Sequence, residues 1–265
     1  MTRLDQELAA RGLARSRTHA QTLISAGAVH VDGHPAAKAS TAVTVDSRIE
    51  VAAADHYVSR AAHKLIAALD AFAVPVSGRV ALDMGASTGG FTQVLRERGA
   101  DPVIAVDVGH DQLASVVAAD VGVIAIEGFN VRHMTAASLA DASGIDAPPA
   151  LVVADLSFIS LRQVLPAAAA VATADADLVL LIKPQFEVGR TAVRGGVVTD
   201  SAAHAAAIAG VLQAGAAEGL GVAGIIASPV VGTHGNREYL VHLSAASGTD
   251  PTEWTGTVDE VTGSP

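Results

Sequence analysis

The sequence predicts a doubly wound α/β domain that follows a small α+β domain, and three observations lead to this fold class. From residue 59 onward, seven apolar segments alternate with stretches of helical periodicity, as in proteins with a mostly parallel sheet. Two of these segments, 150–153 and 178–182, are apolar at every position, which is typical of strands that helices cover on both faces. The last segment, 237–243, follows its neighbour through a loop without a helix, so it can return antiparallel.

The amino-terminal part contains the elements of a compact α-α-β unit. Leu4 and Leu8 share one face of a first helix, and Ser16 can cap a second one. The pair Asp32-Gly33 is typical of a hairpin turn. The expected elements are helices over 3–11 and 17–26, a strand over 29–31 and a β segment that ends at 51.

The large domain is expected to contain seven strands and five helices. The strands are predicted at 79–84, 102–107, 122–126, 150–154, 177–182, 222–227 and 237–243. The helices are predicted at 61–72, 89–98, 111–118, 159–172 and 202–217. The resulting domain boundaries are 1–54 for the small domain, 55–58 for a linker and 59–245 for the large domain. The stretch 246–265 is rich in Ser, Gly, Thr, Pro and acidic residues, so we expect a disordered tail.

Composition excludes several classes of site. The chain has no cysteine, which excludes disulfides, thiolate metal sites and cysteine nucleophiles, and its ten histidines show no helical metal-ligand spacing. We therefore expect no metal. The chain also has no uninterrupted span of about 20 strongly apolar residues and no apolar leader. These features predict a cytoplasmic protein that does not bind membranes.

The net charge of −10 is unevenly distributed along the chain. Residues 1–64 contain eight basic and six acidic side chains, a balance of +2, whereas the remainder contains nine basic and 21 acidic side chains, a balance of −12. A polyanion such as RNA would therefore contact the amino-terminal domain. Arg11, Arg15 and Arg17 cluster near the end of the first helix and the start of the second, where they could bind phosphates. A protein-docking module would have a similar layout.

A glycine-rich loop joins the first strand of the large domain to a helix. Its spacing is G-x-x-x-G-G, which differs from the G-x-G-x-x-G of dinucleotide sites. Asp83, two residues before Gly85, suits a ligand that carries a free amino group. Asp107 ends the second strand, where an acid can bind ribose hydroxyls, and Asn130 follows the third, where an amide could contact an adenine edge.

This arrangement predicts a nucleoside site and favours S-adenosylmethionine over NAD. The alternative is ordinary turn chemistry, because Asp and Asn are common at strand ends. The candidate cofactor-binding residues are Asp83, Gly85, Ala86, Ser87, Thr88, Gly89, Gly90, Phe91, Asp107 and Asn130.

Two lysines and two acids are expected to meet at the carboxyl edge of the sheet, where open α/β sheets bind ligands. Lys183 and Asp155 follow adjacent strands, Glu238 begins the last strand, and Lys64 lies in the helix before the first strand. Unlike arginine, a lysine beside a second cation can lose its proton and act as a general base. Lys183 is our candidate base, and Lys64 would help to keep it neutral. Two structural salt bridges would explain the same residues equally well.

Several motifs resemble the TlyA family of ribosomal RNA 2′-O-methyltransferases, which is also described as haemolysin-like. The motifs are SRAAHKL (59–65), LDMGASTGGFT (82–92), ADLSFISL (154–161), KPQFEVG (183–189), GGVV (195–198) and GNREYL (235–240), together with RGLARSR and LISAGAVHVDG near the amino terminus. The resemblance covers residues 3–243. The linker Asp55-His56-Tyr57-Val58 departs from the Arg-Ala-Trp of some members, which leaves the role of the linker open.

The resemblance implies a fold, an activity and partners. The fold is an RNA-binding domain of the ribosomal-protein S-four type, followed by a Rossmann-like FtsJ/RrmJ-type methyltransferase sheet. The activity is S-adenosylmethionine-dependent methylation of cytidine 2′-hydroxyls, and the partners are ribosomal RNA and ribosomal subunits. The family's catalytic tetrad falls on Lys64, Asp155, Lys183 and Glu238. Two other classes stay open: an RNA-binding ribosome-assembly factor and a pore-forming haemolysin.

Overall fold

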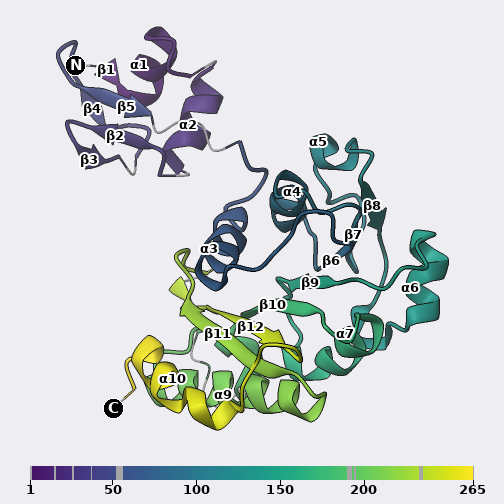
Figure 1. Ribbon diagram of the computed structural model, residues 1–265. Helices are drawn as coiled ribbons and strands as arrows, with labels where there is room; N and C mark the ends of the chain where they lie inside the picture. Colours follow the sequence, from purple (N-terminus) through teal and green to yellow (C-terminus); the bar gives the residue numbers. More distant parts are fainter. Residues whose placement is uncertain are drawn as a thin grey trace. The chain divides into compact units, whose positions relative to one another are not determined.

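The computed structural model describes residues 2–14, 16–25, 27–36, 38–51, 56–189, 193, 195–232 and 235–264. The chain divides into two compact units, Met1–His56 and Tyr57–Pro265 (Figure 1). This division falls inside the stretch that the sequence predicts as a linker. Each unit has its own hydrophobic core.

The first unit packs two helices against short strands. The helices are α1 (Leu4–Ala10) and α2 (Arg17–Ser25), and the strands are β1 (Thr2–Arg3), β2 (Val29–Val31), β3 (His34–Pro35), β4 (Ala42–Val43) and β5 (Ile49–Val51). Strand β2 pairs antiparallel with β3 and β5, and β1 pairs with β4. Asp32 and Gly33 both have positive φ angles, of 51° and 81°, as the tight β2–β3 turn requires. The Ser16 hydroxyl caps α2 by accepting a hydrogen bond from the His19 amide.

The second unit is built on one seven-stranded sheet with the order β11-β12-β10-β9-β6-β7-β8. Its strands are β6 (Ala81–Met84), β7 (Val103–Val106), β8 (Val123–Ile126), β9 (Leu151–Ala154), β10 (Asp177–Ile182), β11 (Gly221–Ala227) and β12 (Tyr239–Ser244). Strand β12 lies between β10 and β11 and is antiparallel to both, whereas the pairs among the other strands are parallel. The predicted α/β fold with an antiparallel last strand is confirmed.

Helices cover both faces of this sheet. On one face lie α3 (Ala62–Phe72) and α4 (Gly90–Glu97), whose apolar residues share a core with β6, β9, β10 and β12. The other face is covered by α6 (Ala136–Ser143), α7 (Leu165–Val171), α9 (Ser201–Ala217) and α10 (Thr255–Thr262). The short elements are α5 (Ser115–Ala118), α8 (Pro184–Glu187), η1 (Val131–His133), η2 (Leu161–Gln163) and η5 (Pro251–Trp254).

The prediction of a disordered tail over 246–265 is wrong. The stretch contains η5 and α10, and α10 packs against α9 and β11. Trp254, Val258 and Val261 face the core, and their spacing of four and three residues is helical. The polar composition of the stretch concealed this narrow apolar stripe.

The predicted helix over 159–172 is divided in the structure. The 3-10 turn η2 ends at Gln163, and α7 begins at Leu165 with Pro166 in its first turn. A proline has no amide hydrogen, so it fits the first turn of a new helix better than the middle of a long one. The helices α6 and α8 were not predicted.

Candidate functional site

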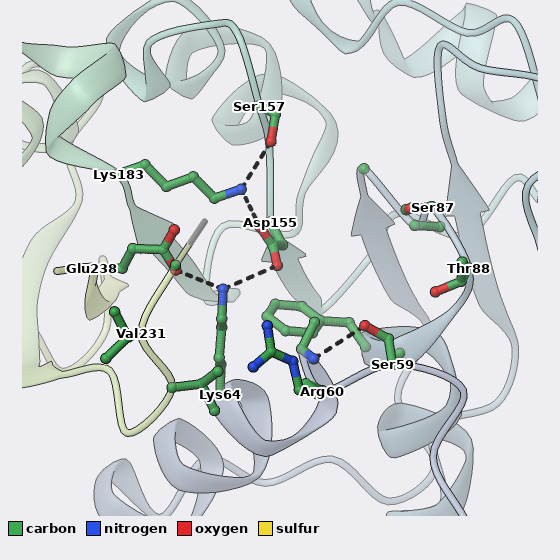
Figure 2. Close-up of a pocket in the computed structure, with 17 residues that line it drawn as sticks. Ser59, Arg60, Lys64, Ser87, Thr88, Asp155, Ser157, Lys183, Val231 and Glu238 are labelled. Atoms are coloured by element: carbon green, nitrogen blue, oxygen red, sulfur yellow. Dashed lines mark hydrogen bonds and ion pairs between the residues drawn. The ribbon is translucent and has the colours of Figure 1, made fainter. Parts of the chain in front are cut away.

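A cavity of about 290 Å³ opens at the carboxyl edge of the sheet (Figure 2). The loop after β6 forms one wall, and the residues that follow β9 and β10 form another. Helix α3 and the residues before β12 complete the lining. The cavity therefore lies at the edge where the carboxyl ends of parallel strands meet.

The four predicted charged residues meet in this cavity. Lys64 Nζ donates a hydrogen bond of 2.6 Å to Glu238 Oε2 and lies 3.8 Å from Asp155 Oδ2. Lys183 Nζ lies 2.7 Å from the other carboxylate oxygen of Asp155 and donates to Ser157 Oγ at 2.9 Å. Figure 2 shows Lys64 reaching up between Glu238 and Asp155, with Lys183 extending above Glu238 toward Asp155 and Ser157.

These four side chains are largely removed from water. Their exposed fractions are 9% for Lys64, 15% for Asp155, 11% for Lys183 and 3% for Glu238. Two positive and two negative groups alternate, so each buried charge has an opposite partner. Burial of charge is costly without such pairing.

The sheet topology explains why residues so distant in sequence meet. Strands β9 and β10 are parallel neighbours, so Asp155 and Lys183 leave the sheet side by side. Strand β12 runs in the opposite direction and pairs Tyr239 with Ile182, so Glu238 begins next to the position where Lys183 follows β10. Only an antiparallel strand could begin at this edge.

The predicted cofactor loop lies against the same charged cluster. Gly85 has a φ of 86°, and a Cβ atom there would lie 2.9 Å from the Asp155 carbonyl oxygen. Gly89 has a φ of 96°, in the left-handed region that favours glycine. At Gly90, a Cβ atom would lie too close to the Ser59 side chain. The cavity lining includes Gly85, Ala86, Ser87, Thr88, Gly90 and Phe91. Glycine is required where the chain turns this closely around the site.

Asp107 and Asn130 line a second cavity of about 480 Å³, which shares Gly85, Ser87, Asp155 and Ser157 with the first. The Asp107 carboxylate accepts hydrogen bonds of 2.8 Å from the amides of Ser87 and Gly109. It is therefore held in place at the end of β7. The Asn130 side-chain oxygen accepts from the Arg132 amide and caps η1.

Asp83 is completely buried in β6. Thr92 donates a hydrogen bond of 2.6 Å to its Oδ2 atom, whereas its Oδ1 atom accepts none from the residues that the structure describes. Burial raises the pKa of Asp83 to about 7, the Thr92 hydrogen bond lowers it, and the nearby charge of Asp155 raises it further. A buried carboxylate oxygen without a donor suits a cationic ligand group.

Three further groups of cavity residues were not predicted. Ser59 and Arg60 precede Lys64 by one turn, so the SRAAHKL motif already carried their signal. Val230, Val231 and Gly232 belong to an irregular loop that gave no periodic signal. Phe158 lines the second cavity with 92% of its surface exposed and a φ of 65°, a conformation that is uncommon for residues other than glycine.

The predicted RNA-contacting arginines of the first unit differ in their surroundings. Arg11 donates to Glu7 and to the carbonyl oxygens of Thr44, Val45 and Ser47, so it anchors the turn before β5. Arg17 lies 3.3 Å from Asp5 and is 54% exposed. Arg15 lies outside the described residues. Of the two described arginines, Arg17 is the more accessible to a ligand.

Two expected absences concern metals and membranes. Within the described ranges, no three His, Cys, Asp or Glu side chains come together in a way that could hold a metal ion. No helix in the described part of the chain has the length and apolar character needed to cross a bilayer.

Family comparisons agree with both units of the fold. Residues 57–245 match the FtsJ-like methyltransferase family, and residues 2–49 match the S4 domain. The 16S/23S rRNA (cytidine-2'-O)-methyltransferase TlyA of Mycobacterium tuberculosis is 48% identical, with 91% of this chain and 89% of that protein covered. Hemolysin A of Brachyspira hyodysenteriae is 36% identical, with coverages of 91% and 99%.

A solved structure from Streptococcus thermophilus, described as that of a candidate hemolysin, superimposes with a TM-score of 0.75. It is 33% identical, and the match covers 99% of this chain and 96% of that chain. The chain therefore belongs to the TlyA family, in which an S4 domain precedes an FtsJ-like methyltransferase unit.

Proposed function

We propose that the protein transfers a methyl group from S-adenosylmethionine to a ribose 2′-hydroxyl of ribosomal RNA. The observation that carries this proposal is the alternating cluster of Lys64, Asp155, Lys183 and Glu238 beside the glycine loop. The Mycobacterium tuberculosis relative is named for the 2′-oxygen of cytidine in 16S and 23S rRNA. We infer the same nucleotide here, and we infer that ribosomal subunits are the partners.

The residues present fit S-adenosylmethionine. The Gly85–Gly89 loop would admit the methionine part. Asp83 is the proposed partner of its ammonium group because its Oδ1 atom has no donor, although the carboxylate is fully buried and lines neither cavity. Asp107 would bind the ribose hydroxyls, and Asn130 in the second cavity would contact the adenine. When bound, S-adenosylmethionine supplies an electrophilic methyl group.

Lys183 is the proposed general base for the ribose hydroxyl. A neutral lysine amine has two hydrogens and one lone pair. Nζ donates a hydrogen bond to Ser157 and forms an ion pair with Asp155 Oδ1 at 2.7 Å, so these two groups would hold Nζ while its lone pair accepts the substrate proton. After Lys183 accepts the proton, the Asp155 carboxylate stabilises the resulting ammonium.

Lys64 and Glu238 have supporting roles in this scheme. The Lys64 ammonium lies 3.8 Å from Asp155, so the two lysines share this carboxylate, and Lys64 would help to orient it toward Lys183. Glu238 fixes Lys64 through its 2.6 Å hydrogen bond. The two lysines therefore differ in function, although both lie next to Asp155.

The first unit is the proposed RNA-gripping part of the protein. Its match to the S4 domain supports this role, and its charge is balanced whereas the second unit is strongly acidic. Arg17 offers an exposed guanidinium, and Arg15 lies two residues before it in the sequence. A phosphate contact of this type adds affinity without base specificity and weakens as salt increases.

The test is methyl transfer by a Lys183→Arg variant to ribosomal subunits and to free ribosomal RNA. Arginine keeps the positive charge but effectively cannot act as a base, so turnover should fall by about 100-fold or more. Lys38→Arg is the matched control, because Lys38 is an exposed residue of the first unit. The RNA product should contain alkali-resistant dinucleotides at the methylated ribose. Release of a methylated base with ordinary mononucleotides refutes the 2′-oxygen assignment, and parental turnover by Lys183→Arg removes Lys183 as the base.

A further inference from the structure

A buried carboxylate that none of the steps above uses joins two loops of the catalytic edge. Glu187 ends α8, four residues after Lys183, and its side chain is almost completely buried. It lines neither of the two cavities described above. A buried carboxylate in such a place needs several donors.

The donors come from the loop that follows β9. The Ser160 hydroxyl donates to Glu187 Oε2 at 2.5 Å, and the Leu161 amide donates to Oε1 at 2.7 Å. The Arg162 guanidinium lies 3.4 Å from the same carboxylate and also donates to the Glu187 carbonyl oxygen at 2.8 Å. Glu187 thus binds three consecutive residues at the start of η2.

Two parallel connections therefore join the same pair of loops. The catalytic connection runs from Lys183 to Asp155 and Ser157, and the second runs from Glu187 to Ser160 and Leu161. The rings of Phe158 and Phe186 lie between them in sequence, with centroids 5.4 Å apart. The Glu187 connection therefore holds the β9 and β10 loops together four residues beyond Lys183.

We propose that Glu187 is a positioning residue that fixes the distance of Lys183 Nζ from Asp155 and Ser157. This inference rests on the proposed function, since it assigns Lys183 the role of base. A displacement of about 1 Å at a reacting group can reduce turnover by about 100-fold without loss of binding. Glu187 thus acts on the reaction through the backbone of α8.

The alternative is that Glu187 only stabilises the fold. The two roles predict different kinetic results, because a structural defect lowers the folded fraction and spares the rate per folded molecule. Asp177 offers a matched control. It is a largely buried acid at the other end of β10, where it pairs with Arg79 and His242, far along the strand from Lys183.

The first experiment measures kcat, RNA KM and cofactor Kd for full-length Glu187→Gln, Ser160→Ala, the double variant and Asp177→Asn. Glu187→Gln and Ser160→Ala should each lower kcat by about 10-fold or more, with cofactor Kd and RNA KM within about twofold of the parent. Their effects should be less than multiplicative in the double variant, because both remove the same contact. Asp177→Asn should turn over at the parental rate.

The second experiment measures the acylation rate of each lysine by peptide mass spectrometry at low modification. The chain has three lysines, so Lys38 is an exposed reference and Lys64 reports the rest of the cluster. Glu187→Gln and Ser160→Ala release the connection between the β9 and β10 loops, so each should raise the ratio of the Lys183 acylation rate to the Lys38 acylation rate by about fivefold or more, because the two loops open locally. The Lys64-to-Lys38 ratio should stay constant.

Each outcome decides the matter. Parental kcat in Glu187→Gln and Ser160→Ala overturns the proposal, as does an equal loss of kcat in Asp177→Asn. An unchanged Lys183 ratio in both variants also overturns it. If Glu187→Gln does not fold, Ser160→Ala carries the same test. If the parental protein itself forms no 2′-O-methyl product, the proposed function fails, while the acylation ratios still test the hold of Glu187 on Lys183.

Discussion

Replacement of Lys64 by methionine tests the charged cluster most directly. Methionine keeps much of the volume of the lysine stem but removes the ammonium group between Glu238 and Asp155. In the described part of the chain, Lys64 is the one hydrogen-bond donor that reaches the Glu238 carboxylate. The variant therefore leaves a buried, unpaired carboxylate.

The expected cost follows from this burial. Breaking a buried pair by removal of one partner destabilises a protein by about 3–5 kcal/mol. For a unit of this size, each kcal/mol lowers Tm by about 2–4 °C, which predicts a shift of roughly 10 °C. The double variant Lys64→Met/Glu238→Gln removes both charges, so it should regain most of the lost stability, but no activity.

The assay is urea denaturation of the full-length protein followed by tryptophan fluorescence. The chain contains a single tryptophan, Trp254, which packs against the core of the second unit and therefore reports the unfolding of that unit. A loss below about 1 kcal/mol in Lys64→Met would refute the reasoning. So would a double variant no more stable than the single one, because the penalty would then not arise from the stranded Glu238.

The remaining predictions concern the cofactor, a buried acid and the first unit. Asp107→Ala should weaken S-adenosylmethionine binding by about 1.5–3 kcal/mol in calorimetry, and unchanged affinity would remove Asp107 from the site. Burial raises the pKa of Asp83 to about 7 in the folded protein. The unfolded chain loses the same proton near pH 4. The protonated carboxyl therefore stabilises the folded state at low pH, and this contribution to the free energy of unfolding is lost as the pH rises toward 7. The free energy of unfolding of Asp83→Asn minus that of the parent should therefore increase by about 1.4 kcal/mol per pH unit between pH 5 and 7 in urea titrations; a constant difference would show that the carboxyl is not held protonated. Residues 57–265 alone should fold and bind S-adenosylmethionine but methylate ribosomal subunits poorly, and full-rate methylation by this fragment would contradict an RNA-gripping role for the first unit.

The sequence predicted the sheet well because its signals are local. Strands that are apolar on both faces can be recognised without knowledge of their neighbours, and β9 and β10 lie where they were expected. The carboxyl edge then brings Asp155 and Lys183 together by topology alone. To place Asp155 and Lys183 at the same edge, it is enough to know that β9 and β10 run in the same direction.

Side-chain partners were much harder to predict, because they depend on tertiary contacts. Arg11 could be assigned to phosphate binding from its charge, but its hydrogen bonds to the carbonyl oxygens of Thr44, Val45 and Ser47 could not be predicted. Glu187 belongs to a recognised motif, yet nothing local indicates that it faces Ser160. The apolar stripe of α10 occupies so few positions that the average composition of residues 246–265 is polar, and the helix was therefore not predicted.

The central position of β12 has a consequence for the order in which the protein becomes active during its synthesis. Edge strand β11 joins the sheet by pairing with β12, and Glu238, which neutralises Lys64, emerges 174 residues after that lysine. A nascent chain that ends before residue 238 contains the whole first unit and the cofactor loop, but it lacks both Glu238 and strand β12. During synthesis, the first unit can therefore fold well before the catalytic charges of the second unit are balanced.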